Sequence, residues 1–454
     1  MNKEGLIKKY NVPVPRYTSY PTVPFWDKDV PDHKQWLEVV KRTFDESNES
    51  LGISVYIHLP YCESLCTYCG CNTRITKNHS VENSYIDTLL AEWKTYLDVF
   101  DEKPIIRELH LGGGTPTFFS PENLSCFIRQ LLTESWLHPD YEFSFEGHPN
   151  NTTREHLKAL YDLGFRRVSY GIQDLDEKVQ KTINRIQPFE NVVRATNEAR
   201  EVGYTSVNFD LVYGLPYQTL DTVRYTIDQI STLKPDRIAY YSYAHVPWIK
   251  PGQRSYTKAD LPADSEKRKL YELGKEMLTN LGYEDIGMDH FALTSDELFE
   301  ASVEKRLHRN FMGYTTSQAE LLIGLGTSSI SDAKYAYAQN AKTVEAYKKD
   351  IEENGLAIFK GHFLNEEDLN IKQHILEVAC QGQTNTEDLQ NQPYWSEINV
   401  KLAEMTAEGL INRVDDFIEV TELGKAFLRN VCAVFDLKLL ASNEQGEQMF
   451  SKSI

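Results

Sequence analysis

Short hydrophobic segments alternate with longer amphipathic segments through the middle of the chain. The short segments are rich in β-branched and aromatic residues, which favours strands, and helix-like segments such as 83–100 and 220–233 follow them. Strands that alternate with helices at this spacing indicate βαβ units and a parallel sheet. The six predicted strands are 54–58, 105–111, 141–146, 166–172, 206–213 and 237–244. Six such units predict an α/β fold with a partial or complete (β/α) barrel.

The hydrophobic pattern changes toward both ends of the chain. A seventh apolar segment, 283–291, is expected to extend the sheet. Residues 409–430 predict a strand, a turn, a strand and a helix, which resembles a winged helix; because this region has no basic face, packing over the body is favoured over DNA binding. Pro13 and Pro15 exclude a continuous N-terminal helix. The predicted domains are an N-terminal segment that covers the active site (1–50), the α/β barrel domain (51–360) and a mostly helical, winged-helix-like C-terminal domain (361–454).

Length, charge and the N-terminal residues restrict the classes of function. The chain has 454 residues, of which 41% are hydrophobic, and no apolar stretch approaches the roughly 20 residues of a membrane span. The N-terminus has no apolar signal region, so we expect a cytoplasmic protein. The net charge of −19 opposes binding to nucleic acid. In a reducing cytoplasm, clustered cysteines more often bind metals or carry out chemistry than form disulfides.

Polar residues and glycines follow the predicted strands at the ends where parallel α/β folds have their active sites. Each residue alone carries little weight, because polar residues at strand ends often cap helices or face solvent. Their joint placement predicts one functional site at one mouth of the sheet. In chain order these residues are Cys62–Cys71, Gly112–Thr115, Glu146, Gln173, Asp174, Asp210, Ala244 and His245.

Four of the seven cysteines fall within the segment YIHLPYCESLCTYCGCN at residues 56–72. Cys62, Cys66 and Cys69 have the spacing C-x3-C-x2-C, which allows three thiolates to surround one compact inorganic cluster. Structural zinc is disfavoured, because its usual sites pair two such turns and the other cysteines do not supply a second one. A [4Fe-4S] cluster ordinarily has four cysteine ligands. Spacing alone leaves open whether Cys71 is the fourth ligand or a free thiol beside an open iron.

The cysteine spacing after the first strand, together with the GGGTP loop at 112–116 after the second, resembles the radical S-adenosylmethionine enzymes. The resemblance implies a partial (β/α)6-type radical SAM barrel and a [4Fe-4S] cluster held by Cys62, Cys66 and Cys69. In these enzymes the amino and carboxylate groups of S-adenosylmethionine chelate the open iron. An aromatic side chain such as Tyr68 can cover adenine, and glycine lets the backbone approach the cofactor closely.

Motifs along nearly the whole chain resemble the oxygen-independent coproporphyrinogen III oxidases of that superfamily. The PRYTSYP segment and the C-x-C that ends at Cys71 distinguish this family from the shorter heme chaperones that share the cluster. The resemblance implies that two propionate side chains of coproporphyrinogen III become vinyl groups, giving protoporphyrinogen IX for heme biosynthesis. A 5'-deoxyadenosyl radical would remove hydrogen from the propionate, a step beyond any side-chain base. The further motifs are HLGGGTPT (110–117), GIQD (171–174), DLVYGLPYQT (210–219), SYAHVP (242–247), GMDHFA (287–292), HRNFMGYTT (308–316) and TELGKAFLRNVC (421–432).

The resemblance also implies roles for individual residues. The residues expected to hold the cluster-bound S-adenosylmethionine are Tyr56, Gly113, Glu146 and Ile330. Those expected to contact a second S-adenosylmethionine are Tyr68, Gly114, Thr115, Gln173, Arg185, Asp210 and Ala244. Carboxylates accept hydrogen bonds from ribose hydroxyls, and a guanidinium fits a cofactor carboxylate. Tyr56 and Cys71 are the candidate catalytic residues. The segment GHPNN (147–151) departs from the more acidic turn that the family pattern leads us to expect.

A tetra-anionic substrate needs basic residues near the mouth of an acidic protein. The candidate ligands of its propionates are Arg16, Lys250, Arg254, Arg306 and Arg309. We also expect a reducing electron-transfer protein as a partner, and a monomeric chain. Two other classes of function stay open: a heme chaperone, and an electron carrier in which Cys71 completes the ligand set of the cluster.

Overall fold

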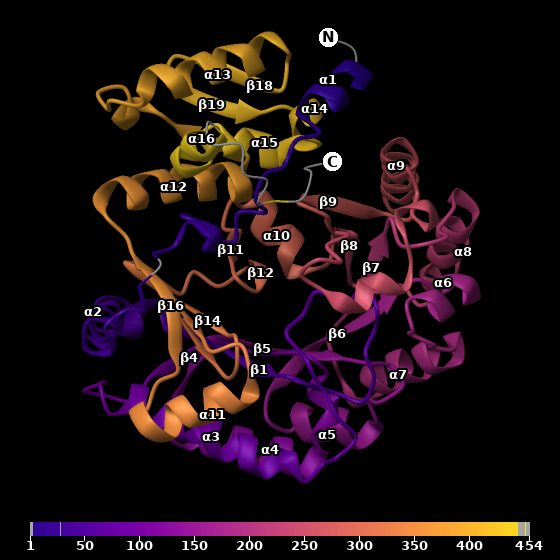
Figure 1. The fold of residues 1–454 in the computed structure, drawn as a ribbon, viewed down its shortest axis with the longest axis vertical. Coiled ribbons are helices and arrows are strands. Elements are labelled where there is room, and N and C mark those ends of the chain that lie inside the picture. Colours follow the sequence, from indigo (N-terminus) through magenta and orange to yellow (C-terminus); the bar gives the residue numbers. More distant parts are fainter. Residues whose placement is uncertain (1–2, 28, 444–449, 451–454) are drawn as a thin grey trace.

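One large mixed sheet forms the centre of the computed structural model, which describes residues 3–27, 29–443 and 450 (Figure 1). Its twelve strands follow the order β16-β15-β14-β13-β1-β4-β5-β6-β7-β8-β10-β9. The six predicted strands lie side by side in chain order and are parallel. They are β1 (Ile53–Leu59), β4 (Ile105–Gly113), β5 (Trp136–Gly147), β6 (Phe165–Gln173), β7 (Ser206–Tyr213) and β8 (Arg237–Ser242). The predicted parallel α/β body is therefore confirmed.

Helices cover the outer face of the parallel strands, and Figure 1 shows them as an arc from α3 to α9. Helix α4 is typical: Ser120 caps its first turn, Pro121 starts it, and Leu124, Phe127 and Leu131 are buried at helical spacing. Among the described residues, no helix is both long and apolar enough to cross a membrane. The bounds are α3 (Val81–Leu97), α4 (Pro121–Thr133), α5 (Arg154–Tyr161), α6 (Glu177–Thr182), α7 (Phe189–Val202), α8 (Leu220–Ser231) and α9 (Asp264–Asn280).

Further strands extend both edges of the parallel region. The predicted seventh segment forms the antiparallel hairpin of β9 (Tyr283–Gly287) and β10 (His290–Leu293), and β10 pairs with β8. At the other edge, β13 (Leu321–Leu325) pairs in parallel with β1, a strand that the sequence prediction missed. The remaining strands there are β14 (Ile330–Ala333), β15 (Ala336–Asn340) and β16 (Ile358–Phe363), with α11 (Val344–Asn354) between the last two. Because β16 and β9 are the two ends of the order, the barrel is open, as the partial-barrel prediction requires.

The N-terminal residues belong to two hydrophobic cores. Helix α1 (Lys3–Tyr10) buries Leu6 in a core shared with the C-terminal helices, and Tyr17 and Tyr20 are buried in the same core. Helix α2 (His33–Leu51) packs instead on the large sheet and contributes Trp36 to the barrel core. The described part of the predicted N-terminal segment therefore packs in both bodies, and its role as a cover over the site stays a prediction.

The C-terminal region forms a second layered body at one end of the molecule, in orange to yellow in Figure 1. Residues 409–430 have the predicted order of strand, turn, strand and helices, with a third strand, β17, beside them in the order β17-β19-β18. The second core also includes residues between Ile286 and Tyr314, so it extends well before residue 361; the domain boundaries stay predictions. The bounds are α10 (Glu297–Val303), β11 (His308–Asn310), β12 (Gly313–Thr315), α12 (Glu366–Gln381), β17 (Gln383–Asn385), α13 (Trp395–Ala407), β18 (Ile411–Val414), β19 (Phe417–Val420), α14 (Glu422–Lys425), α15 (Leu428–Ala433) and α16 (Leu437–Asn443).

Candidate functional site

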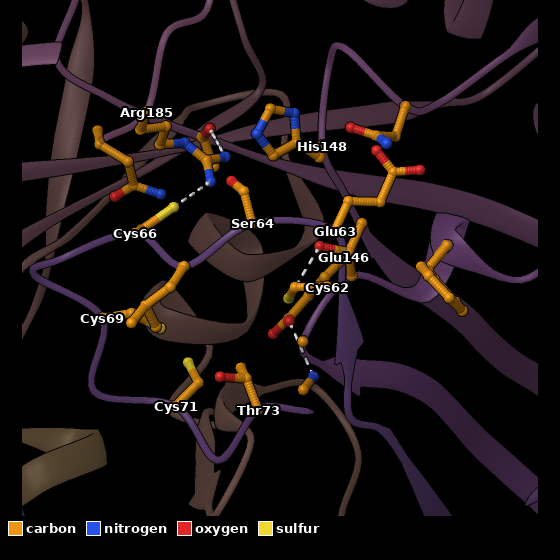
Figure 2. A pocket seen from close by; sticks show the side chains of 18 of the residues that line it. Cys62, Glu63, Ser64, Cys66, Cys69, Cys71, Thr73, Glu146, His148 and Arg185 are labelled. Atoms are coloured by element: carbon orange, nitrogen blue, oxygen red, sulfur yellow. Dashed lines mark hydrogen bonds between the residues drawn. The ribbon is translucent and has the colours of Figure 1, made fainter. Parts of the chain in front are cut away.

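A cavity of about 660 Å³ lies where the parallel strands end (Figure 2). This is the position expected for the site of a parallel α/β fold, because the carboxyl ends of parallel strands meet at one edge. The predicted site residues that line it are Cys62, Cys66, Tyr68, Cys69, Cys71, Gly113, Gly114, Thr115, Glu146, Gln173, Arg185 and Asp210. The predicted residues that do not line it are Tyr56, Ala244 and Ile330 and, from the strand-end set, Gly112, Asp174 and His245. Lys250, Arg254, Arg16, Arg306 and Arg309 also lie outside its wall.

The cysteine loop is fixed at both ends by hydrogen bonds. Its ends form a short parallel pair, β2 (Tyr61–Cys62) with β3 (Arg74–Ile75). Between them the Thr67 amide donates to the Ile183 carbonyl at 2.9 Å, and the Asn184 side chain donates to the Leu65 carbonyl at 2.8 Å. Figure 2 shows the four cysteine side chains around the same space, with Arg185 beside Cys66. The loop is therefore held in place by residues that follow β6.

Three cysteine thiols line the cavity together and are the ligand type that an iron–sulfur cluster uses. Among the described residues, no group of three His, Cys, Asp or Glu side chains is placed to hold one metal ion. Burial raises the pKa of the Cys62 thiol to about 11. The hydrogen bond between Cys69 and Cys71 lowers the pKa of Cys69 and raises that of Cys71. The donor set of Cys62, Cys66 and Cys69 fits the expected cluster.

The glycine loop after β4 packs directly on the exit of β1. A Cβ atom at Gly114 would lie 2.6 Å from the Pro60 carbonyl oxygen, and one at Gly113 would lie 2.9 Å from the His58 ring. Gly113 also has a φ of 114°, which favours glycine. The amides of residues 114 and 115 donate to the carbonyls of Leu59 and Tyr61. Glycine is required here by the close approach of two strand ends, in addition to any approach of a cofactor.

Glu146 and Tyr56 belong to one side of the site. The Glu146 carboxylate accepts a hydrogen bond from the Gly113 amide at 3.1 Å and lies 3.6 Å from His110, which leaves acceptor capacity toward the cavity. Nε2 of His58 donates to the Asn72 carbonyl at 2.8 Å, and burial lowers the pKa of this ring. The neutral ring therefore accepts the Tyr56 hydroxyl at Nδ1, at 3.1 Å. Tyr56 is thus linked through His58 to Asn72, the residue that follows Cys71.

Ile330 lies close to Tyr56 through the added strand. Tyr56 pairs with Gly324 of β13, and a Cβ atom at Gly324 would lie 2.5 Å from the Ile330 carbonyl oxygen. The backbone of Ile330 therefore packs against β13 beside Gly324, the residue that pairs with Tyr56. Neither the Ile330 nor the Tyr56 side chain lines the cavity.

Arg185, Gln173 and Asp210 belong to the other side of the site. Arg185 donates to the Gly171 carbonyl at 2.5 Å and to the Cys66 sulfur at 3.6 Å. Gln173 has a φ of 68°, and the β6–β7 register shifts between Gly171 and Gln173. Asp210 accepts a hydrogen bond from the Ser169 hydroxyl at 3.3 Å. Burial, with the nearby Glu146 carboxylate, raises the pKa of Asp210 to about 7. This side offers one cation and one carboxyl group to a ligand.

Sequence reasoning missed Gln253, which connects three parts of the site. Its buried amide donates to the Tyr68 carbonyl at 3.1 Å and to the Ala244 carbonyl at 3.2 Å. It also accepts from the Val246 amide at 2.6 Å. No local signal identifies such a residue, because its partner Tyr68 lies 185 positions away. His148, in the segment that departs from the family pattern, also lines the cavity, as do Ser169 and Tyr241.

The five basic candidates do not form one group. Arg16 pairs with Asp289 at 3.4 Å and lies over the Tyr241 ring, and Lys250 donates to the Cys71 carbonyl at 3.1 Å, so both reach the neighbourhood of the site. Arg306 pairs with Glu304 at the surface. Arg309 donates to the Arg16 carbonyl at 3.3 Å and lines a separate cavity of about 330 Å³. Arg254 donates to the Pro247 carbonyl at 2.9 Å, within the turn that also carries Lys250.

The comparisons with known proteins agree with this architecture. The family model of the Radical SAM superfamily matches residues 56–230. The chain is 36% identical to the oxygen-independent coproporphyrinogen III oxidases of Synechocystis sp. and of Escherichia coli, with 99% of this chain covered and 97% and 98% of theirs. The solved structure of the coproporphyrinogen III oxidase (HemN) from Escherichia coli, a radical SAM enzyme, has a TM-score of 0.89 at 35% identity, covering 96% of this chain and 98% of that one. The chain therefore belongs to the family of the oxygen-independent coproporphyrinogen III oxidases, within the radical SAM superfamily.

Proposed function

We propose that the strand-end cavity carries out the anaerobic oxidative decarboxylation of coproporphyrinogen III to protoporphyrinogen IX, turning two propionate side chains into vinyl groups. The observation that supports this most is the meeting of three thiols, the glycine loop and the strand-end carboxyl groups in one cavity. When bound, the [4Fe-4S] cluster and S-adenosylmethionine supply a carbon radical that removes hydrogen from the substrate. A reducing electron-transfer protein is the partner class that this chemistry needs.

The residues nearest the glycine loop have the binding role for the first S-adenosylmethionine. Cys62, Cys66 and Cys69 hold the cluster, and the Glu146 carboxylate accepts hydrogen bonds from amine or hydroxyl donors of the cofactor. Gly113 allows backbone contact with its methionine moiety. Tyr56, fixed by His58, supports this side of the cavity from behind its wall.

A second S-adenosylmethionine is proposed on the side of Arg185 and Asp210. The guanidinium of Arg185 fits a cofactor carboxylate, and Asp210 suits ribose hydroxyls. Gln173 lies next to them and supplies an amide that both donates and accepts. Ala244 contributes to this side indirectly, because Gln253 joins its carbonyl to that of Tyr68. Two molecules correspond to the two propionates, each of which loses one hydrogen.

Cys71 is proposed as a free thiol at the site, with a catalytic role that is separate from cluster binding. Lys250 contacts the carbonyl of the same residue, so this part of the cysteine loop is linked to the turn after β8. The other possibility, Cys71 as a fourth ligand, makes a closed cluster and an electron carrier.

Anaerobic turnover with S-adenosylmethionine, a reductant and coproporphyrinogen III tests the proposal. Product analysis is expected to detect protoporphyrinogen IX, measured after oxidation to protoporphyrin IX, with carbon dioxide and methionine released. A chain that binds heme under the same conditions and forms no vinyl product is a heme chaperone, and that result overturns the proposal. A chain that leaves S-adenosylmethionine uncleaved is an electron carrier.

A further inference from the structure

The turn between β8 and α9 exposes two large apolar side chains next to the site. We name residues 245–256 the Trp248 turn. Trp248 is 69% exposed and Ile249 is 65% exposed. The turn also contains Lys250 and Arg254, and it contains no acidic residue, although the whole chain has a net charge of −19. It is therefore an apolar and locally cationic surface on an acidic protein.

The Trp248 turn is held in one conformation by its own hydrogen bonds. The amides of Ile249 and Lys250 both donate to the Val246 carbonyl at 2.9 Å, and residues Pro251–Ser255 form a 3-10 helix. The Gln253 side chain is 1% exposed and binds the Val246 amide from inside. Arg254 donates back to the Pro247 carbonyl. Trp248 and Ile249 are thus presented to the outside by a well-bonded turn.

The Trp248 turn borders the cysteine loop directly. Lys250 donates to the Cys71 carbonyl at 3.1 Å, and Gln253 donates to the Tyr68 carbonyl at 3.1 Å. A Cβ atom at Gly252 would lie 3.4 Å from the Leu65 side chain. Leu65 itself is exposed and lines the site cavity. Leu65 therefore brings an apolar side chain from the cavity wall to the Gly252 part of the turn.

We infer that the Trp248 turn, with Leu65, is the docking surface for the macrocycle of the tetrapyrrole substrate. The inference rests on the proposed function and adds residues to it. A coproporphyrinogen has an apolar ring framework with four carboxylates at its rim, so it needs apolar contact flanked by cations. Trp248 and Ile249 supply the contact, and Lys250 and Arg254 pair with propionates that are not reacting. Lys250 keeps donors for this, because an ammonium has three and the Cys71 carbonyl uses one.

The test compares two exposed tryptophans. Trp248→Ala removes the proposed contact; Trp136→Ala is the matched control, because Trp136 is 63% exposed but starts β5, at the end of the sheet opposite the cavity. The first measurement is equilibrium binding of coproporphyrin III, the stable oxidised form of the substrate, by fluorescence on anaerobically reconstituted protein. Trp248→Ala is expected to weaken binding on the order of tenfold, because a large aromatic contact is lost, while Trp136→Ala leaves it unchanged. Equal affinities of Trp248→Ala and the parent overturn the inference.

The second measurement is turnover of the same variants with two reductants. With dithionite, Trp248→Ala is expected to raise KM for coproporphyrinogen III with a small effect on kcat, since the cysteine loop is unchanged. If Trp248→Ala slows turnover only with a protein reductant, the surface binds the electron donor and the inference is wrong. Failure of the parent to form a vinyl product contradicts the proposed function instead. Melting temperatures equal to the parent's verify that the variants are folded.

Discussion

Replacing Gln253 with leucine removes a buried amide that holds three backbone groups in place. The side chain is 1% exposed, and its loss leaves the Tyr68 and Ala244 carbonyls and the Val246 amide without this partner. A buried polar group left unsatisfied costs about 1–3 kcal/mol. Because Tyr68 lines the water-accessible cavity, we take the lower value for each of the three groups. The free energy of unfolding of the variant is therefore expected to be lower by about 3 kcal/mol.

The functional consequence follows from the position of Gln253 between the cysteine loop and the end of β8. Without it, the Tyr68 side of the loop is free to move away from Ala244. We expect a melting temperature lowered by about 3 °C or more, and weaker binding of S-adenosylmethionine. Thermal unfolding followed by circular dichroism and anaerobic equilibrium binding measure the two effects.

Two further variants make the Gln253 test specific. Gln253→Glu keeps the acceptor for the Val246 amide but cannot donate to the two carbonyls. Its melting temperature and its affinity for S-adenosylmethionine are therefore expected to fall at least as far as those of Gln253→Leu. Gln392→Leu changes a glutamine that is exposed, and it is expected to match the parent. If Gln253→Leu has the parent's melting temperature and the parent's affinity for S-adenosylmethionine, the bridging role assigned to this residue is wrong.

Three other predictions follow from the site and the cores. Cys62→Ser is expected to lose iron after anaerobic reconstitution, whereas Cys71→Ser keeps it; equal iron loss in both variants refutes the open-iron arrangement. In the cofactor-free protein the folded chain binds an extra proton at Asp210 between its ordinary pKa of 3.8 and its raised pKa of about 7, so stability falls as pH rises through that window. Asp210→Asn is expected to flatten this part of the pH profile in thermal unfolding, and a profile parallel to the parent's contradicts the assignment. Deleting residues 1–20 removes core side chains such as Tyr17, so loss of soluble, folded protein is expected; a truncated protein that still folds and binds the cluster shows that the segment is only a cover.

The sequence by itself determined the parallel strands, the mouth of the sheet at which the candidate site residues lie, and which three cysteines are predicted to bind the cluster. These features are local: a strand is marked by a short apolar run, and the thiols of Cys62, Cys66 and Cys69 are placed by spacing within one loop. The strand-end rule then brought Glu146 and Asp210 to one mouth, because parallel strands share the direction of their carboxyl ends. The motifs along the chain were sufficient to indicate the family.

The tertiary structure alone decided which distant segments meet. Arg185 contacts Cys66 across 119 positions, and Gln253 bonds to Tyr68 across 185, without any local pattern that marks either pair. Tyr17 donates to Asp436 across 419 positions, which joins the N-terminal segment to the C-terminal body. Hydrophobic periodicity shows which face of an element is buried, but it does not name the partner that buries it, since burial is non-directional and satisfied by any well-packed surface. The partners of these residues are therefore set by the packing of the whole chain.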